Sequence, residues 1–382
     1  MLSLAAVGCG GSAENDGGAG GKAPGGSGPG GASGSGGSGA ASGGSAGAPV
    51  GGASGAGGAG GASGGSAGGA GGGSAGSSSG GAGGTSDVAD PRQNGPAATT
   101  SFDGKASVPA TKNSVPMHCV IPSGPSAKAP FPVVLVAHGF QLPASQYDGY
   151  ANRLATHGII GCTVDFPAGF SANHAANAQD VSGALDWVLV QSTQSGSGLF
   201  GKVDINQFGA MGHSLGGKVS VLAAKNDPRI RAVLGLDPVD TSTLCDATKC
   251  PDASNAQPLG IPTAYLGETT DATAGITGQA CAPSADNFQT FYQKANGPSL
   301  EVTLNGANHM SFVDDVAACG VICSFCNKAT QPAALSLDVS RAYSVAFFAR
   351  FLKDETGYDA WLTGANAKAT WIDTGQISVQ SK

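Results

Sequence analysis

The stretch Gly212-His213-Ser214-Leu215-Gly216 separates an apolar run that ends at Met211 from a helix-like run that begins at Lys218. A strand that ends here must turn sharply into a helix, and glycines on both sides of the serine remove Cβ atoms that would clash in that turn. The serine hydroxyl is then exposed, with the amino end of the helix behind it. A Gly-x-Ser-x-Gly pattern also occurs in ordinary tight turns, but its position between strand-like and helix-like sequence favours the strand–turn–helix interpretation.

Composition divides the chain into two parts. Of the 65 glycines, 38 precede residue 91, and the first aromatic residue is Phe102. Residues 10–96 are mostly glycine, serine and alanine, so they cannot bury enough apolar area to offset their ordering entropy, and we predict a disordered tether. About 75 residues of such a coil reach roughly 45–50 Å. Residues 97–382 are sufficient for one α/β domain with a substantial core.

Residues 1–9 are similar to the signal segment of a bacterial lipoprotein. A short apolar run leads to Ala6-Val7-Gly8-Cys9, which resembles a lipobox. In such lipoproteins the cysteine becomes the diacylated first residue, and two acyl chains give stable membrane anchoring. The resemblance implies export and attachment to the cell envelope through Cys9. The alternative is an unprocessed N-terminus with an incidental cysteine.

The second part of the chain holds eight cysteines. An even number of cysteines in an exported domain is typical of disulfide bonds, although the sequence does not reveal the pairs. A bond between Cys245 and Cys250 would close a short local loop. The eight are Cys119, Cys162, Cys245, Cys250, Cys281, Cys319, Cys323 and Cys326.

Cys319, Cys323 and Cys326 also have the spacing of a radical-enzyme iron–sulfur motif. That motif normally lies near the first strand of a barrel, whereas here the cysteines follow most of the domain. A structural zinc site would need His309, which is better explained as a catalytic base. We therefore expect no metal and no organic cofactor.

Charge disfavours one class of partner. The formal net charge is −7 and the chain has no basic cluster. A nucleic acid is therefore not an expected partner. We expect a monomer that meets the membrane only through its N-terminal lipid.

In the second part, apolar β-branched runs alternate with helix-like stretches, which predicts a mostly parallel sheet with helices on both faces. The predicted strands are 131–137, 159–164, 203–211, 230–236, 262–266 and 300–304. The predicted helices are 148–157, 173–191, one beginning near Ser214, 286–295 and 335–353.

A serine, an aspartate and a histidine follow predicted strands in that order along the chain. A serine hydroxyl is a weak nucleophile at neutral pH, so it needs a base within hydrogen-bond reach and a carboxylate that orients the base. His309 lies in the loop after the last predicted strand and is the candidate base. His138 and His213 are expected to orient backbone beside the site. The remaining histidines are expected at the surface or in the core: His118, His157 and His174.

Three aspartates are candidates for the orienting carboxylate. Asp237 follows the strand after the serine helix, Asp271 follows the next strand, and Asp240 is a weaker third choice. We favour Asp237, because solvation does not readily explain an aspartate at the end of an apolar strand.

Ester chemistry also needs two N–H groups directed at the oxyanion. We predict that Leu215 and Phe140 supply them from their backbone amides, Leu215 because it follows the serine and Phe140 because it follows an early strand.

The motifs together resemble two groups of α/β hydrolases. The His138-Gly139-Phe140 turn, residues 212–217, Gly235-Leu236-Asp237-Pro238-Val239 and His309-Met310 are similar to the chlorophyllase-like family. That family takes its acid from the position of Asp237, and its plant members commonly carry arginine at the position of Leu215. Residues 203–217 and 343–362 are similar to bacterial cutinase-like polyester hydrolases, whose acid lies at the position of Asp271.

The resemblance implies an α/β-hydrolase fold for residues 97–382 and a carboxylic ester hydrolase that forms an acyl-enzyme on Ser214. His309 would be the base, Asp237 the acid, and hydrophobic esters such as lipids or polyesters the substrates. Two alternatives share the same residues. One is a non-catalytic binding module on a hydrolase fold, and the other is an acyltransferase.

Overall fold

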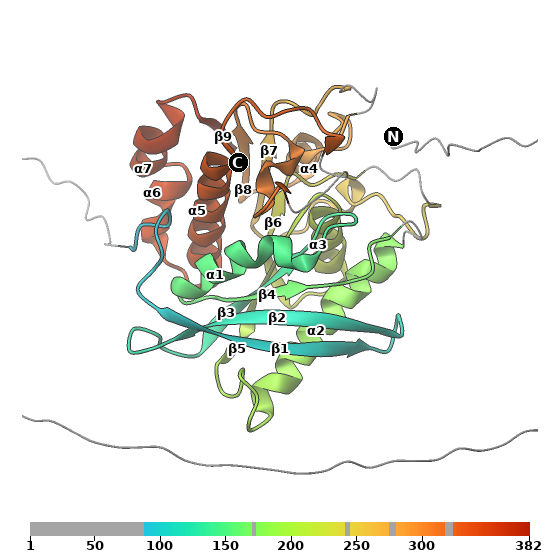
Figure 1. Cartoon of the computed structure of the whole chain (residues 1–382), viewed down its shortest axis with the longest axis vertical. Coiled ribbons are helices and arrows are strands. Elements are labelled where there is room, and N and C mark those ends of the chain that lie inside the picture. The colour runs from blue at the N-terminus through green and yellow to red at the C-terminus, as the bar shows by residue number, and fades with distance from the viewer. Residues whose placement is uncertain (1–87, 170–172, 241–244, 275–279, 318–323) are drawn as a thin grey trace, which may run out of the picture. The chain divides into compact units, whose positions relative to one another are not determined.

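The computed structural model describes residues 88–382 except 170–172, 241–244, 275–279 and 318–323 (Figure 1). Cys9, Cys319, Cys323 and the predicted tether up to residue 87 lie outside the described residues. No helix in the described part of the chain is long and apolar enough to cross a membrane.

The strands are β1 (Ala98–Val108), β2 (Asn113–Ser123), β3 (Phe131–Ala137), β4 (Ile160–Val164), β5 (Val203–His213), β6 (Ile230–Leu236), β7 (Thr263–Glu268), β8 (Ser299–Leu304) and β9 (Ile377–Ser381). The helices are α1 (Asp148–Thr156), α2 (His174–Thr193), α3 (Leu215–Asn226), α4 (Phe288–Lys294), α5 (Ala333–Leu352), α6 (Asp359–Leu362) and α7 (Ala365–Ala367). Two short 3₁₀ turns matter for the site, η1 (Ala144–Tyr147) and η3 (His309–Phe312).

These strands form one sheet in the order β1-β2-β4-β3-β5-β6-β7-β8-β9. The six strands from β4 to β8 in that order are parallel, whereas β1, β2 and β9 are antiparallel to their neighbours. The predicted α/β-hydrolase fold with a mostly parallel sheet is therefore confirmed. Because parallel strands share a direction, the loops after β3, β5, β6, β7 and β8 all lie at one edge of the sheet.

Helices cover both faces of the sheet (Figure 1). Side chains of α2, α3 and α4 pack into one hydrophobic cluster, and side chains of α1, α5 and α6 pack into a second. Strand β3 contributes to both, with Val133 and Leu135 in the first cluster and Val134 and Val136 in the second. This alternation explains its continuous apolar sequence, since successive side chains point to opposite faces and both faces are buried.

The N-terminal hairpin β1–β2 was not predicted from the sequence. The first half of β1 is largely exposed, so its polar sequence carries no core pattern, and only eleven paired residues against β2 define it as a strand. A disulfide between Cys119 and Cys162 joins β2 to β4 at directly paired positions. The hairpin is thereby fixed to the parallel part of the sheet.

The folded domain begins before the predicted boundary at residue 97. The guanidinium group of Arg153 on α1 donates to the carbonyl oxygens of Pro91 and Arg92. The amide of Gly95 donates to the side-chain oxygen of Thr156 on the same helix. Residues 91–95 therefore pack on the domain.

Candidate active site

The predicted turn around Ser214 is present between β5 and α3. Ser214 has φ 54° and ψ −118°, a strained backbone conformation for a residue other than glycine. A Cβ on Gly212 would lie 2.4 Å from the carbonyl carbon of Gly216, and a Cβ on Gly216 would lie 2.2 Å from the oxygen of Ala137. Both glycines are therefore required by close backbone approach, and the turn projects the Ser214 side chain at the edge of the sheet.

The structure brings Ser214, His309 and Asp237 into one hydrogen-bonded row. Nε2 of His309 lies 2.9 Å from Oγ of Ser214, and Nδ1 lies 2.6 Å from Oδ2 of Asp237. His309 is the first residue of η3, in the loop after β8, while Asp237 directly follows β6. The three residues come from three different loops at the same edge of the sheet.

Asp237 is completely buried, and its backbone is strained at φ 43°. Its other carboxylate oxygen, Oδ1, is buried without a hydrogen-bond partner among the described residues. Burial raises the pKa of Asp237, and the hydrogen bond and charge of His309 oppose that rise. The carboxylate therefore directs its negative charge at the imidazole.

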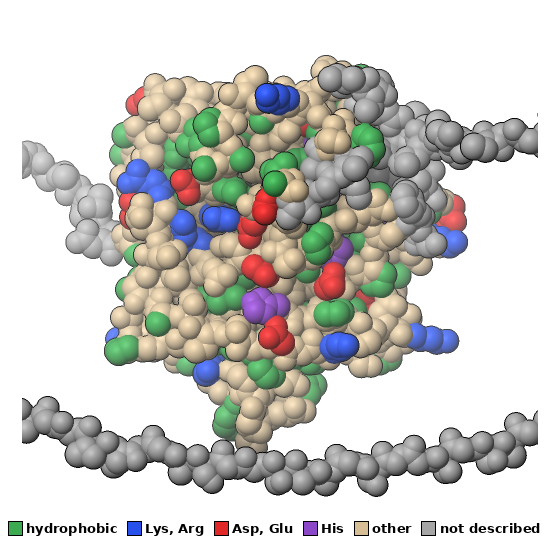
Figure 2. Space-filling model, in the orientation of Figure 1, with side chains coloured by type: hydrophobic (Ala, Val, Ile, Leu, Met, Phe, Trp, Pro, Cys, Tyr) green, Lys and Arg blue, Asp and Glu red, His purple; other side chains and the backbone are tan. Residues whose placement is uncertain are grey.

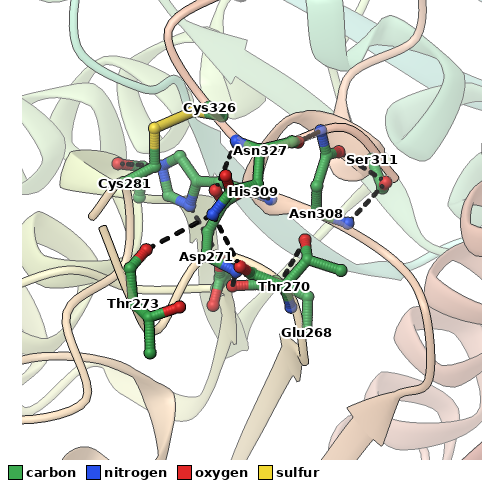
Figure 3. Close-up of a disulfide and its surroundings, with 12 residues drawn as sticks. Glu268, Thr270, Asp271, Thr273, Cys281, Asn308, His309, Ser311, Cys326 and Asn327 are labelled. Carbon is green, nitrogen blue, oxygen red and sulfur yellow. Dashed lines mark hydrogen bonds and ion pairs between the residues drawn. A yellow bond between two sulfur atoms is a disulfide. The ribbon is translucent and has the colours of Figure 1, made fainter. Parts of the chain in front are cut away.

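Asp271 bonds to backbone, and Figure 3 shows it beside the loop that carries His309. Its Oδ2 accepts the amide N–H of His309 at 2.8 Å, and its Oδ1 accepts the amide N–H of Asn327 at 2.6 Å. The second candidate for the acid thus holds the main chain of the candidate base, while Asp237 holds the ring.

Asp240, the third candidate, forms a buried ion pair with Lys218 on α3 at 3.0 Å. Its carboxylate also accepts the amides of Ala253 and Ser254, both at 2.9 Å. These partners give Asp240 a structural role in joining α3 to the loop after β6.

Two titratable groups beside Asp237 have shifted pKa values. Burial alone would lower the pKa of His309, but the hydrogen bond and charge of Asp237 outweigh it and raise that pKa above its ordinary value. Burial raises the pKa of Glu268, at the end of β7, to about 8, and the negative charge of Asp237 adds to the rise. Burial and the charge of Asp237 thus favour the protonated form of Glu268, while the amides of Thr270 and Asp271 that donate to its carboxylate oppose this shift.

A disulfide between Cys281 and Cys326 joins the loop after β7 to the loop after His309 (Figure 3). The side chain of Asn327, next to Cys326, donates to the carbonyl oxygen of Thr270. One ligand atom from each of Asp271, Cys281 and Cys326 lies within 4.8 Å of the others, but the two sulfurs are bonded to each other. Neither is a free thiolate, so Cys326 is not available to a zinc or iron–sulfur site.

The predicted oxyanion donors are Leu215, which directly follows Ser214, and Phe140, in the loop after β3. Leu215 is the first residue of α3, and the amide of a first helical residue has no acceptor within its own helix. Phe140 lies in the loop after β3, which His138 supports from within. Nδ1 of His138 lies 2.8 Å from the carbonyl oxygen of Gly139, and Nε2 of His138 lies 2.9 Å from the carbonyl oxygen of Phe166. This arrangement agrees with the backbone-orienting role expected for His138.

The other histidines differ in their surroundings. His157 is buried between the carbonyl oxygen of Gln93 and the hydroxyl of Tyr358, and His118 pairs with Asp103 at the surface. His174 is buried with Nδ1 unpartnered among the described residues, and burial lowers its pKa to about 4. On the face seen in Figure 2, acidic, basic and apolar side chains are interspersed, without a continuous basic surface.

Sequence reasoning did not identify Tyr147 or Glu268 as part of the site. Glu268 ends an apolar strand, which is the same pattern that singled out Asp237, so a signal existed. Tyr147 carried no such signal, because its contact with His213 joins residues 66 positions apart.

Comparisons with known proteins identify the family of the chain. The chain is 25% identical to a bis(hydroxyethyl) terephthalate hydrolase of Streptomyces coelicolor over 61% of this chain and 61% of the relative. It is 23% identical to chlorophyllase-2 of Arabidopsis thaliana, covering 50% and 63%, and 22% identical to cutinase est2 of Thermobifida alba, covering 60% and 62%. The chain thus spans about three fifths of these relatives. The chlorophyllase family model matches residues 93–374, nearly the whole described domain, and the chain therefore belongs to the chlorophyllase family of α/β hydrolases.

Proposed function

We propose that the protein hydrolyses carboxylic esters through an acyl-enzyme on Ser214. The observation that carries this proposal is the continuous row from Ser214 Oγ through the imidazole of His309 to Asp237, with both bonds at hydrogen-bond distance. A binding module has no need of a base aligned with a hydroxyl and a carboxylate aligned with that base. The row is therefore best explained by catalysis.

In the first half of the reaction, Nε2 of His309 accepts the hydroxyl proton of Ser214 as Oγ attacks the ester carbonyl carbon. The carbonyl oxygen takes up negative charge, and the amides of Phe140 and Leu215 donate to it. The protonated imidazole then gives its proton to the departing alcohol as the carbon–oxygen bond breaks. The acyl group remains on Ser214.

In the second half, water attacks the acyl carbon and gives a proton to His309. The tetrahedral intermediate collapses, the proton returns to Ser214, and the carboxylic acid leaves. Asp237 keeps the ring in the tautomer with a proton on Nδ1 and stabilises the imidazolium in both halves. Asp237 raises the pKa of His309, and a raised pKa is the sign that stabilisation of the imidazolium requires.

For the substrate we propose hydrophobic esters, which include aromatic and polymeric ones. The relatives named above are a terephthalate ester hydrolase, a chlorophyllase and a cutinase, which are all ester hydrolases. Val316 and Phe325, on the segment that follows His309 and η3, are 39% and 43% exposed. Exposed apolar side chains favour contact with such substrates.

We further propose that the protein is exported and attached to a membrane through a lipid on Cys9. Three disulfides in the described domain fit an oxidising compartment. Labelled palmitate should be incorporated into the full chain and not into Cys9→Ser. Equal incorporation in both would refute lipid attachment at this residue.

The proposed reaction is tested with Ser214→Ala and p-nitrophenyl esters of graded chain length. The variant should lose about four to six decades of kcat, and a fluorophosphonate should label the wild type alone. Ser220→Ala is a matched control, since this buried serine on α3 donates to the carbonyl oxygen of Gly216 and does not belong to the row. Retained turnover in purified Ser214→Ala would refute the assignment, and an unlabelled, inactive wild type would favour a binding module.

A further inference from the structure

A buried chain of three hydrogen bonds joins two loops of the site. The amide of Gly139 donates to the phenol oxygen of Tyr147 at 3.2 Å. The Tyr147 oxygen lies 2.7 Å from Nδ1 of His213, and Nε2 of His213 lies 2.8 Å from the carbonyl oxygen of His309. Tyr147 and His213 are completely buried. The chain therefore runs from the loop after β3 to the loop after β8 without contact with solvent.

With a neutral His213, the two ends of the chain determine the direction of every bond. An amide N–H only donates and a carbonyl oxygen only accepts. The Nε2–H of His213 therefore donates to the carbonyl of His309, and Nδ1 accepts the hydroxyl proton of Tyr147. The Tyr147 oxygen in turn accepts the amide of Gly139. One neutral tautomer of His213 satisfies all three bonds, and burial together with the charge of nearby His309 holds the pKa of His213 well below its ordinary value.

At the first end, the backbone approaches the two side chains closely. A Cβ on Gly139 would lie 3.0 Å from Nδ1 of His213 and 3.2 Å from the oxygen of Tyr147. Only glycine fits there without displacing the pair. The next residue is Phe140, whose amide is the proposed oxyanion donor, so the chain ends one peptide unit from that donor.

At the other end, the backbone of His309 is held on both sides. Its carbonyl oxygen accepts from His213, and its amide donates to Asp271 at 2.8 Å. The rings of His213 and His309 also pack with their centroids 4.7 Å apart. His213 directly precedes Ser214, so the side chain of His213 adjoins the nucleophile, the base and the loop after β3 that carries Phe140.

We propose that Tyr147 and His213 are positioning residues for ester hydrolysis. They hold the loop that carries Phe140 and the loop that carries His309 in place relative to Ser214. The inference rests on the proposed function of the site. Among the described residues, neither side chain forms a hydrogen bond with Ser214 Oγ or with the imidazole nitrogens of His309, whose partners are Ser214 and Asp237. Tyr147 acts through Gly139 on the amide of Phe140, and His213 acts through the backbone of His309 on the imidazole.

The test is Tyr147→Phe in the full chain, which removes one oxygen and keeps the ring. Gly139 and His213 then lose their common partner, so the oxyanion donor and the base are held less precisely. We expect kcat on p-nitrophenyl butyrate to fall roughly 10- to 100-fold, less than the loss of an oxyanion donor itself. KM should change by less than about threefold, because an interaction felt mainly in the transition state lowers kcat and not ground-state binding. The rate of labelling by a fluorophosphonate should fall with kcat.

Tyr343→Phe is the matched control. Tyr343 is 1% exposed, and its hydroxyl donates to the carbonyl oxygen of Leu362, away from the site. Both variants lose one buried hydroxyl, so a merely structural effect should lower their melting temperatures to a similar extent and leave kcat alike. A kcat of Tyr147→Phe equal to that of Tyr343→Phe would overturn the proposal.

His213→Gln and His213→Leu give a second, independent comparison. Glutamine has both a donor and an acceptor at the end of its side chain and can restore part of the chain, whereas leucine can restore none. We expect His213→Gln to retain at least tenfold more kcat than His213→Leu at similar melting temperature. Equal activity of these two variants contradicts the proposal. This comparison still applies if Tyr147→Phe does not fold. An inactive, unlabelled wild type would instead refute the proposed function itself.

Discussion

The loops after β6 and β7 each place an aspartate beside His309, yet the two carboxylates do different things. Asp237 and Asp271 are 0% and 1% exposed, so burial does not distinguish them. Asp237 bonds to the imidazole and has a second oxygen without a partner among the described residues. Asp271 uses both oxygens to accept backbone amides, one from His309 and one from Asn327.

The difference shows how two buried charges can serve one histidine. A carboxylate that accepts two backbone N–H groups is stabilised by those dipoles and fixes the path of the main chain. A carboxylate with a single hydrogen-bond partner interacts most strongly with that partner, which here is the ring of His309. We therefore expect Asp237 to govern the protonation of the base and Asp271 to govern the position of its loop.

Among the substitutions that test this comparison, Asp237→Asn has the largest expected effect. Asparagine keeps the shape but removes the charge and permits the wrong tautomer of His309, so kcat should fall by about four decades. The acid limb of kcat/KM reports protonation of His309, whose pKa Asp237 raises. Activity is lost as pH falls through that raised pKa, so in Asp237→Asn the residual acid limb should move to lower pH. A pH profile of kcat/KM on a p-nitrophenyl ester measures both effects.

Asp271→Asn should have an intermediate effect. Asparagine can accept only one of the two amides well, so the loop of His309 loosens while the bond from Asp237 to the ring remains. We expect kcat to fall roughly 10- to 100-fold, the range for one hydrogen bond to a charged group. The acid limb should move less than in Asp237→Asn. If Asp271→Asn lost as much kcat as Asp237→Asn, or more, the assignment of the two aspartates would be reversed.

The smallest effect is expected for Glu268→Gln, and it concerns stability. The pKa of Glu268 rises from 4.5 to about 8 in the folded protein. Between those pH values the folded state binds more protons than the unfolded state, so the free energy of unfolding falls as pH rises. Glutamine cannot titrate, so the melting temperature of Glu268→Gln should fall less steeply from pH 5 to pH 8 than that of the wild type.

Glu355→Gln provides the control for this measurement. Glu355 follows α5, its side chain is 37% exposed, and it pairs with Lys353 at the surface. Its replacement removes one carboxylate at the surface, so it controls for the loss of a single negative charge. Parallel curves for the wild type and Glu268→Gln would show that Glu268 does not hold a proton in the folded state.

Much of the fold could be predicted because its signals are local. Strands β3 and β6 have the predicted bounds, and the serine turn is indicated by glycines at positions where a Cβ would clash with the backbone. Hairpin β1–β2 could not be predicted in this way. Half of β1 is exposed, so its strand pairing depends on a partner and not on an apolar pattern.

The candidate site was predicted in part for the same reason. Ser214, His309 and the aspartates each end or follow a strand, and chain order alone indicates that they share one edge of a parallel sheet. The roles of Tyr147 and Glu268 were missed. A hydrogen bond from η1 to the end of β5 and a proton held by burial depend on neighbours distant in sequence.

The sequence by itself thus determined the parallel part of the sheet, the serine turn and the set of residues from which a base and an acid could come, because apolar periodicity and glycine sterics act within a few residues. Only the tertiary structure decided which aspartate faces the imidazole ring and which one faces the backbone. Both aspartates follow neighbouring parallel strands, and they differ in their partners, the ring of His309 for Asp237 and the amides of His309 and Asn327 for Asp271. These contacts join parts of the chain that lie far apart in the sequence.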